Sequence, residues 1–500
     1  MTIDATADLA ARAAHRRVIV IGGGIGGLVA ARECAKVGMH VTVLEAEEEV
    51  GGAIRRGDLD GLTVDAGAES YATRGGHVRK LIEELGLADR IVTPNAAGAW
   101  LVGVPGADAV PLPKGGILGI PANPFADDVR RIIGWGGSWR AYVDRLRPPL
   151  TIGQERSLGT LVARRMGKKV RDLLVAPVTA GVYSADPDDV DTEIAAPGLN
   201  EALTRTGSLS GGVGQLLAER ADRSSKAPGS AVEGIAGGMS LLVDALAADL
   251  AELGATVRTG TAVSGIARDG DGWAATVSAA TEEVDGTEGA DETIVADAVI
   301  IATAEPAART LLAGHVSGLG EEGRAPQIEI VSLLLDAPSL DGAPRGTGVL
   351  TVPGSSTAKA LTHATAKWGW LREGAGGRHV VRVSFGAQGE PAATTGLAVD
   401  AAALLALREA ATMLGVPLPE SSLVAAHRAH FTQSQPASLI GASDRRRRVR
   451  ATVEKVEGLG VVGAWLSGTG LAQVIPDATA EADRLRRALL WGDDAPLSTP

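Results

Sequence analysis

The sequence predicts a mixed α/β protein with more than one domain, and three observations support this. Its 500 residues far exceed the roughly 150 residues of a typical domain. Short β-branched runs alternate with helical patterns near the amino terminus. The composition, 45% hydrophobic and 22% charged, is that of an ordinary globular chain and excludes a disordered or collagen-like protein.

The first elements form a strand–helix–strand unit. The apolar run Arg17–Ile21 ends directly in glycines, which is typical of a buried parallel strand. Residues 28–37 are predicted to form a helix that stops at Gly38, and residues 41–44 to form a second strand that ends at Glu45. The whole unit, from Arg17 to Glu45, has the length of a βαβ crossover.

Three glycines lie between the first strand and the helix. Gly22, Gly24 and Gly27 form the pattern G-x-G-x-x-G, and Glu45 follows at the end of the second strand. The first glycine allows a tight turn, the second lets the backbone approach a pyrophosphate, and the third lets helix and strand pack closely. A carboxylate at the position of Glu45 accepts hydrogen bonds from ribose hydroxyls. The spacing predicts a Rossmann-type dinucleotide site; the alternative is a glycine-rich turn without a ligand.

A second glycine turn bears on whether the dinucleotide is NAD or FAD. Gly51 and Gly52 follow the acidic residue, and a turn there lets the chain lie along a longer, extended cofactor. This arrangement resembles the FAD-binding pattern of the flavin amine oxidase superfamily. The resemblance implies FAD contacts at Gly67 and Ala68 as well, within the segment 65–70.

The charge expected beside the phosphates is displaced in this chain. In the superfamily an arginine or lysine commonly follows the glycine pair, whereas this chain has Ala53. Arg55, which we expect to bind the cofactor, or Arg56 would then meet the phosphates. The alternative is that both arginines are solvated loop charges.

Further resemblances follow in order along the chain. Gly237-Gly238-Met239 looks like the helix start of the same superfamily, and Val263 matches a position whose backbone meets the adenine. Residues 302–304 match a strand end that re-enters the cofactor domain. Residues 463–471 look like the turn before the final helix, and the resemblance places the amides of Thr469, Gly470 and Leu471 at the pyrimidine edge of the flavin.

Two segments resemble one branch of this superfamily. Two parts of the chain are similar to the oxygen-dependent protoporphyrinogen/coproporphyrinogen III oxidases, of the bacterial coproporphyrinogen III oxidase type. One is the segment 177–185, and the other is the run from Gly348 to Leu350 followed by Ala358-Lys359-Ala360 and Ala366-Lys367-Trp368. The resemblance extends from about residue 17 to residue 490. The chain departs from the bacterial pattern at residues 431–436 and 441–442, which border the substrate side.

The resemblance implies a discontinuous Rossmann-type FAD-binding domain, an interleaved substrate-binding sheet domain and a helical subdomain. The expected FAD-binding domain comprises residues 15–90, 230–325 and 455–492. The expected helical subdomain covers 91–229 and lines the substrate side, and the sheet domain covers 326–454. Residues 1–14 and 493–500 are expected to be flexible termini.

The activity implied is the six-electron oxidation of coproporphyrinogen III to coproporphyrin III in haem biosynthesis, with non-covalent FAD and oxygen as acceptor, giving hydrogen peroxide. The resemblance places Gly181, Thr347 and Leu350 at the substrate; for Leu350 simple core packing is the alternative. No catalytic acid or base is assigned. Protoporphyrinogen IX, another amine oxidase or carotenoid desaturase activity, and a flavin-retaining scaffold that hands tetrapyrrole to the next enzyme stay open.

Substrate propionates need cations at the mouth of the site. The sequence offers four candidates and does not choose among them: Arg74, Lys114, Arg205 and Lys367. The cluster from Arg445 to Arg448 suits a helix with a basic outer face, or a surface that docks an anionic partner or lipid head groups.

Composition narrows the partners. A net charge of -12 argues against nucleic acid. Cys34 is the only cysteine, and the first fifteen residues contain two aspartates and lack a continuous apolar stretch, so we expect no disulfide, no signal peptide and a cytoplasmic protein. No metal, no transmembrane segment and, at most, peripheral membrane contact are expected.

Overall fold

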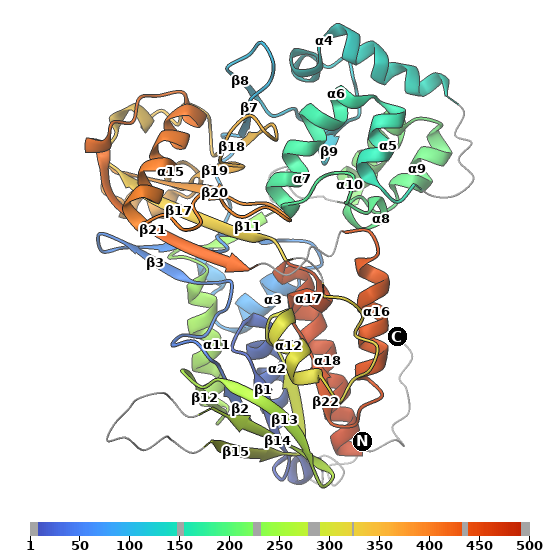
Figure 1. Ribbon diagram of the computed structural model, residues 1–500, viewed down its shortest axis with the longest axis vertical. Helices are drawn as coiled ribbons and strands as arrows, with labels where there is room; N and C mark the ends of the chain where they lie inside the picture. Colours follow the sequence, from blue (N-terminus) through green and yellow to red (C-terminus); the bar gives the residue numbers. More distant parts are fainter. Residues whose placement is uncertain are drawn as a thin grey trace.

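The structure is a computed structural model that describes residues 9–147, 155–223, 232–278, 291–322, 325–432 and 439–491. Figure 1 shows an elongated molecule with a parallel sheet in its lower part and a larger sheet beside a group of helices in its upper part. Residues 1–8 and 492–500 lie outside the described ranges. Residues 9–13, expected to be flexible, are helical, and Ala13 is buried against the core.

Five parallel strands form the lower sheet in the order β12-β2-β1-β16-β22. Their apolar side chains are buried on both faces, as is usual for parallel strands covered on each side. The strands are β1 (Arg17–Ile21), β2 (His40–Leu44), β12 (Thr256–Arg258), β16 (Ala298–Ile301) and β22 (Leu459–Val461).

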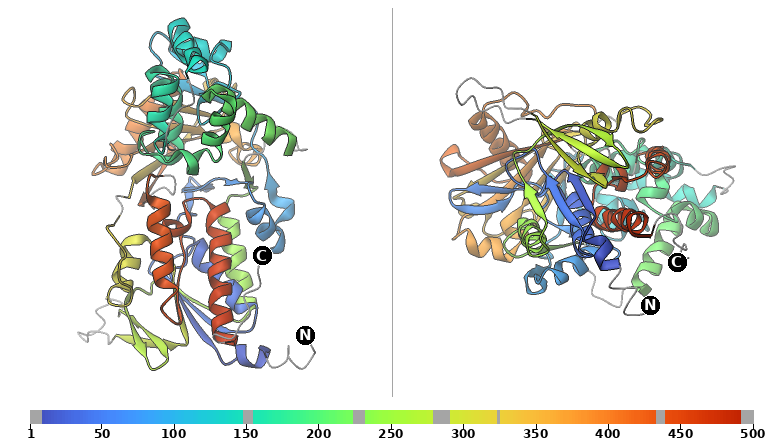
Figure 2. Two further views of the ribbon diagram at one scale, coloured as in Figure 1. Left: turned by 90° about the vertical axis from the view of Figure 1, so that its right-hand side faces the viewer. Right: turned by 90° about the horizontal axis from the view of Figure 1, so that it is seen from below.

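The two faces of this sheet have different covers. On one face lie three helices that share a hydrophobic core: α2 (Ile25–Ala35), α11 (Ser240–Glu252) and α18 (Leu471–Trp491). On the other face lie the antiparallel strands β13 (Val263–Asp269), β14 (Gly272–Val277) and β15 (Glu292–Ala296), together with α12 (Glu305–Leu312) and α16 (Ala442–Val453). Figure 2 shows α18 and α16 running side by side along the lower body.

Seven strands form the upper sheet in the order β21-β17-β20-β19-β18-β7-β8. The helix α15 (Val399–Leu414) covers one face of it, and their buried residues form one core. The strands are β7 (Ala99–Val102), β8 (Ala109–Pro111), β17 (Gln327–Leu335), β18 (Gly348–Thr351), β19 (Ala360–His363), β20 (His379–Phe385) and β21 (Leu423–Thr432).

Two of these strands come from the segment expected to be helical. β7 pairs in parallel with β18, and β8 pairs with β7. The range 91–229 is therefore not purely helical, because its first part completes the edge of the upper sheet. The alternation in these short strands is weak, and only pairing with β18, far along the chain, stabilises them.

Short helices make up the rest of the range 91–229 and pack around their own core. The helix α5 (Leu158–Arg165) ends just before Gly167, which has φ +96°. The helix α4 (Asp127–Tyr142) is kinked at Gly134. The other long elements are α7 (Ala176–Tyr183), α9 (Leu199–Thr206) and α10 (Leu209–Arg223).

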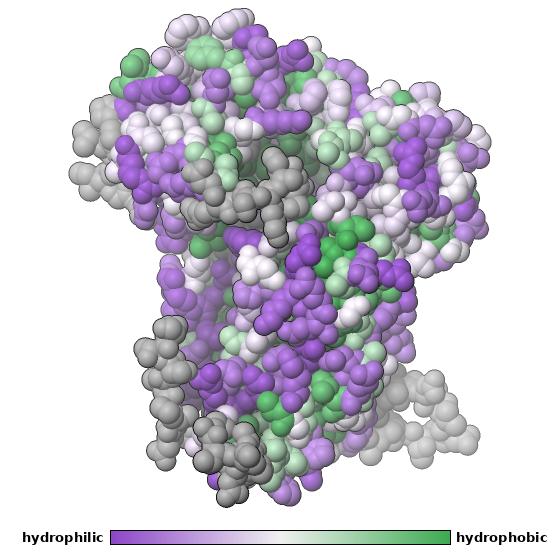
Figure 3. Space-filling model, turned by 180° about the vertical axis from the view of Figure 1, so that it is seen from behind, coloured by the Kyte–Doolittle hydropathy of each residue, from purple (hydrophilic) through white to green (hydrophobic). Residues whose placement is uncertain are grey.

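Small pairings link the lower and upper parts of the molecule. The hairpin β3 (Arg56–Leu59) and β4 (Leu62–Asp65) lies against β21, and β11 (Val232–Ile235) pairs with β5 (Tyr71–Ala72) and β6 (Ile91–Val92). Within the described ranges, no helix combines the length and the apolar character needed to span a bilayer. Hydrophilic residues cover most of the face seen in Figure 3.

The first turn of α2 offers a matched test of close packing. A Cβ at Gly27 would lie 2.0 Å from the carbonyl oxygen of Gly22, whereas a Cβ at Gly26 would meet nothing closer than 3.4 Å. We expect Gly27→Ala to destabilise the protein by about 1–3 kcal/mol through overpacking. Gly26→Ala should be neutral or slightly stabilising, since alanine favours the helix. Thermal unfolding of both variants checks this; equal melting temperatures would contradict it.

Candidate functional site

The ends of three parallel strands bring distant parts of the chain together. A Cβ at Gly22, which has φ +110°, would lie 2.8 Å from the carbonyl carbon of Ala302, just after β16. A Cβ at Gly26 would lie 3.5 Å from the Cα of Gly463, just after β22. The amino-terminal glycines and the carboxy-terminal turn therefore meet at the carboxyl edge of the sheet, where open α/β sheets bind their ligands.

The two glycine turns form one cradle. The amide of Gly51 donates to the carbonyl oxygen of Gly23 at 2.8 Å, and Gly24 pairs with Gly51 as an isolated parallel bridge. A Cβ at Gly52 would lie 3.2 Å from the Cα of Gly24, so side chains at these positions would narrow the space between the turns. The first amides of α2 have no partner within the helix, which makes this edge suitable for phosphate oxygens.

Glu45 closes one side of this cradle. Its Oε2 accepts a hydrogen bond from the amide of Gly23 at 2.6 Å, and its Oε1 accepts one from the amide of Glu47 at 2.9 Å. Its carbonyl oxygen accepts from the amide of Thr261 at 2.7 Å. Val263, the first residue of β13, follows two residues later, so the structure places Glu45 and the expected adenine contact at one corner.

The carboxy-terminal turn presents a helix end at the same edge. After α17 (Ala464–Ser467) and Gly468, which has φ +112°, the helix α18 begins at Leu471. Thr469 and Gly470 are exposed. The first-turn amides of a helix carry partial positive charge, so this end can stabilise negative charge on a bound group.

The structure separates the two candidate arginines. Arg55 Nε donates to the carbonyl oxygen of Gly52 at 2.9 Å, and its guanidinium lies 5.7 Å from the centre of the Phe431 ring. Arg56 instead forms an ion pair with Asp244 at 2.5 Å. Arg55 therefore stays beside the glycine pair, and Arg56 is held at α11.

Gly67 and Ala68 lie against the same turn. A Cβ at Gly67 would lie 2.1 Å from the carbonyl oxygen of Ala53, and the amide of Ala68 donates to that oxygen at 3.3 Å. This close approach requires glycine at position 67. The segment therefore runs directly beside the cradle.

A buried carboxylate fastens the upper sheet to this segment. Glu69 pairs with Arg382 of β20 at 2.7 Å and with Lys367, and Arg382 also donates to the carbonyl oxygens of Ala66 and Gly67. Burial alone would raise the pKa of Glu69, but Arg382 and Lys367 together lower it to about 2. Lys367, one of the four propionate candidates, is therefore bound by Glu69.

The upper sheet leaves one face uncovered by α15. Directly paired residues share a face, and Leu350, Ala360, Ser384 and Ile330 form one such row across four strands. Each of these residues is partly exposed, whereas the alternating residues are buried beneath α15. Apart from Leu350 and Ile330 the row is small, so this face is flat.

The helix α7 forms the wall at one end of this row. A Cβ at Gly181 would lie 2.7 Å from Cδ2 of Leu350, so two of the three expected substrate residues are in contact. The third, Thr347, precedes β18, and its hydroxyl donates to the carbonyl oxygen of Gly98 at 3.0 Å. Val182, next to Gly181 on α7, is 62% exposed. We call the region where the uncovered sheet face meets α7 the slot.

Of the propionate candidates, Arg74 is the one beside α7. Burial raises the pKa of Tyr183, and the nearby charge of Arg74 acts in the opposite direction. Arg205 lies within 3.9 Å of two glutamates, and Lys114 is exposed on a loop.

The arginine cluster forms the helix α16, as its spacing predicts. Val449 and Val453 are buried, and Arg447 is 77% exposed and pairs with Asp444. Arg450 is bound through two nitrogen–oxygen contacts of 2.6 and 2.8 Å to Asp477 of α18. A hollow of about 790 Å³ lies between α16, α17 and the start of α18.

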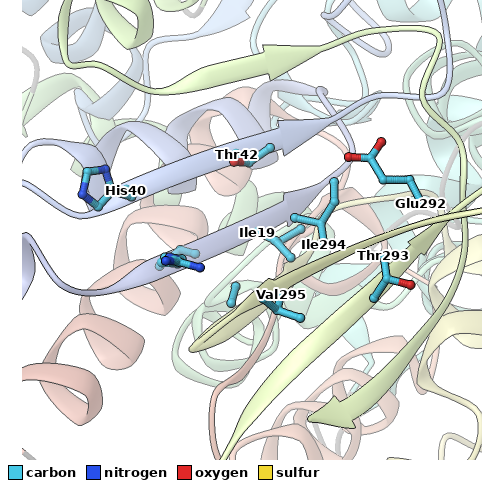
Figure 4. A pocket seen from close by; sticks show the side chains of 10 residues that line it. Ile19, His40, Thr42, Glu292, Thr293, Ile294 and Val295 are labelled. Atoms are coloured by element: carbon cyan, nitrogen blue, oxygen red, sulfur yellow. The ribbon is translucent and has the colours of Figure 1, made fainter.

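A second hollow, of about 310 Å³, lies between β1, β2 and β15. Figure 4 shows Ile19, His40 and Thr42 on one side of it and Ile294 on the other. It lies along the amino-terminal halves of β1 and β2, away from the glycine cradle, so we assign it no role in the site. Among the described residues, no group of three histidines, cysteines or carboxylates is arranged as a metal site.

Comparison with known proteins identifies the family. The model of the flavin containing amine oxidoreductases matches residues 25–486. The chain belongs to this family. It is therefore an oxidoreductase of a flavin-dependent family, as the sequence predicts.

Several relatives are similar over the whole chain. Coproporphyrinogen III oxidase of Propionibacterium freudenreichii subsp. freudenreichii is 26% identical over 96% of this chain and 92% of that protein. Coproporphyrinogen III oxidase of Mycobacterium bovis is 27% identical over 97% and 99% of the two chains. A putative protoporphyrinogen oxidase from Exiguobacterium sp. 255-15 has a similar structure, with a TM-score of 0.78, 22% identity and coverage of 94% and 99%. The predicted fold class and family are confirmed.

Sequence reasoning missed two of the residues that organise the site. Arg382 lies in the middle of an apolar strand, and a charge there signals a buried ion pair, which could have been noticed. Phe431 had no such signal, because its contact with Arg55 depends on how β21 crosses the β3–β4 hairpin.

Asp65 makes the stability of the folded protein depend on pH in a way that can be tested. Its Oδ1 accepts a hydrogen bond from the amide of Met239 at 2.8 Å, and burial raises its pKa from 3.8 to about 6 although Arg382 opposes this. The folded protein thus holds this proton more tightly than the unfolded chain, and the stability so gained is lost as the pH rises from about 4 to 6.

Asp65→Asn keeps an acceptor for Met239 but removes the charge. We expect its free energy of unfolding at pH 8 to exceed that of the unmodified protein by up to about 3 kcal/mol, with the difference shrinking toward pH 4. Denaturant unfolding at several pH values measures this. Asp65→Ala, which removes the acceptor, should be destabilised throughout; a pH-independent difference for Asp65→Asn would contradict the prediction.

Proposed function

We propose that this protein catalyses the FAD-dependent six-electron oxidation of coproporphyrinogen III to coproporphyrin III, with oxygen as acceptor, in haem biosynthesis. The observation that carries the proposal is the partly exposed row Leu350, Ala360 and Ser384, which meets Gly181 of α7. Arg382 of the same sheet contacts Gly67, which lies beside the glycine cradle. A flat macrocycle suits such a surface. Similarity over nearly full length to proteins named coproporphyrinogen III oxidase supports this choice.

The residues of the cradle fit a non-covalently bound FAD. Glu45 would bind the adenosine ribose, and Val263 would meet the adenine. The paired turns at Gly24 and Gly52 leave room for the pyrophosphate and supply amides to it. The exposed segment 469–471 would present helix-end amides to the pyrimidine edge of the flavin. The bound flavin supplies the hydride acceptor at its N5.

The residues of the chain itself would position the substrate and exclude water from it. Small side chains along the uncovered sheet face let a macrocycle approach closely, and Leu350 with α7 confines it. The main-chain carbonyl of Gly181 is the proposed acceptor for pyrrole N–H groups. Aromatisation drives the reaction, so no dedicated acid or base is required, and holding a meso carbon in place is the main task of the protein.

Protoporphyrinogen IX is the second candidate substrate, since it differs at two side chains of the ring. An amine oxidase activity fits less well, because amine oxidases usually line the flavin with aromatic side chains, whereas the row from Leu350 to Ile330 has none. A cytoplasmic location, oxygen as the acceptor and contact with the next enzyme of the pathway stay predictions.

The substrate is tested by single-turnover reduction of the flavin. Anaerobic coproporphyrinogen III should bleach the yellow holoprotein, and its specificity constant should exceed that of protoporphyrinogen IX. Benzylamine should leave the flavin oxidised. Faster reaction with the amine would favour the amine oxidase alternative, and a colourless protein without bound FAD would exclude the proposed activity.

The ribose contact is tested at Glu45. Glu45→Ala removes both the acceptor for the ribose and the bond to Gly23, and we expect FAD to bind about 10- to 100-fold more weakly. Fluorescence titration of the apoprotein with FAD measures this. Glu47→Ala is the matched control, since Glu47 contributes its backbone amide and carbonyl to these contacts, and alanine keeps both. Unchanged affinity in Glu45→Ala would show that the ribose lies elsewhere.

A further inference from the structure

Three chain segments meet at the far end of α7. Ser184, which follows α7, accepts a hydrogen bond from Nζ of Lys359 at 2.6 Å on its Oγ. Its carbonyl oxygen accepts one from the amide of Gln388 at 2.9 Å, in the loop after β20. Ser184 is buried, and its φ of +53° is a backbone conformation that serine rarely adopts.

Within the described part of the chain, the ammonium group of Lys359 has no carboxylate within ion-pair distance. Its Nζ donates a hydrogen bond to Ser184 Oγ. Glu409 of α15 is nearby in the chain fold, but it binds Ser356 and the amide of Ala358 instead. Burial lowers the pKa of Lys359 to about 8, so the group is still mostly charged at neutral pH.

A buried polar atom of Gln388, whose backbone amide donates to Ser184, has no partner among the described residues. Within the described part of the chain, Oε1 of Gln388 is buried without a hydrogen-bond partner. The two ends of a carboxamide are interchangeable by rotation, so Gln388 can present either an acceptor or an NH₂ donor. Lys359, with three N–H donors and one bond to Ser184, and Gln388, once its carboxamide is turned, can therefore each offer a donor to a ligand.

This place adjoins the slot. Ser184 lies three residues after Gly181, which touches Leu350, and Lys359 directly precedes Ala360 of the uncovered row. Arg74 approaches Tyr183, the residue before Ser184. The carboxyl end of α7 therefore has two cations beside it. The negative end of a short helix offsets only part of the cost of burying an ammonium group, so the helix alone does not account for Lys359.

We propose that Lys359, held by Ser184 and supported by Gln388, binds one propionate carboxylate of the porphyrinogen in the slot. This deepens the proposed function and rests on it. A carboxylate would supply the missing counterion and accept these donors, which makes the pair more favourable than the partly buried cation alone. Lys359 then positions the ring; it takes no part in the chemistry.

The test compares binding of an acid and its ester. The probe is coproporphyrin III, titrated into the holoprotein and followed by porphyrin fluorescence, with its tetramethyl ester as the uncharged counterpart. We expect Lys359→Met to bind the acid about 10-fold more weakly and the ester equally well. Lys359→Arg, which keeps the charge, should bind the acid within about threefold of the unmodified protein. In turnover, KM for coproporphyrinogen III should rise with little change in kcat.

Measurements of melting temperature distinguish a binding role of Lys359 from a structural role. Removing an uncompensated buried charge should leave the melting temperature of Lys359→Met unchanged or higher. Lys80→Met, on the exposed surface of α3 (His77–Glu84), is the matched control and should change neither property. Equal binding of the acid by Lys359→Met, or equal weakening of acid and ester, would overturn the proposal for Lys359 while leaving the proposed function intact. Failure of the unmodified protein to bind coproporphyrin III would overturn both.

Discussion

The site depends on one constraint: segments from the amino-terminal and carboxy-terminal parts of the chain pack closely together at the carboxyl edge of the parallel sheet. Gly22 approaches Ala302, and Gly26 approaches Gly463, so three strand ends meet without intervening side chains. Two helix starts, of α2 and α18, consequently lie at one edge and bring their free amides together. A dinucleotide with a second ring system needs contacts along its whole length, and no single segment of the chain could supply them.

Fixing the second sheet relative to this edge requires a different interaction. Glu69 follows the glycine at position 67 that approaches Ala53, and it is bound by Arg382 and Lys367 from the upper sheet. A buried ion pair adds little net stability, because desolvation offsets most of the attraction, but it is strongly directional. We therefore infer that the ion pair of Glu69 with Arg382 orients the sheet face relative to the cradle.

Local features of the site could be predicted from the sequence, whereas contacts between distant segments could not. The glycine spacing and Glu45 depend on one βαβ unit, so the pattern alone located them. The strands β7 and β8 escaped prediction because their partner β18 lies far along the chain. The same holds for Lys359: the sequence showed it only as part of the resembling motif Ala358-Lys359-Ala360, and its contact with Ser184, which lies 175 positions earlier in the chain, could not be predicted from that motif.

The distribution of charge around the slot argues for an anionic, flat ligand. The middle of the sheet face carries small neutral side chains, and the cations lie at its margins. Lys367 is bound by Glu69, Lys359 is bound by Ser184, and Arg74 lies near Tyr183. A small amine would gain nothing from these marginal cations and would be repelled by them. A macrocycle with acidic side chains would place its apolar ring over the small residues and its carboxylates at the margins, which is the arrangement that burial and charge both favour.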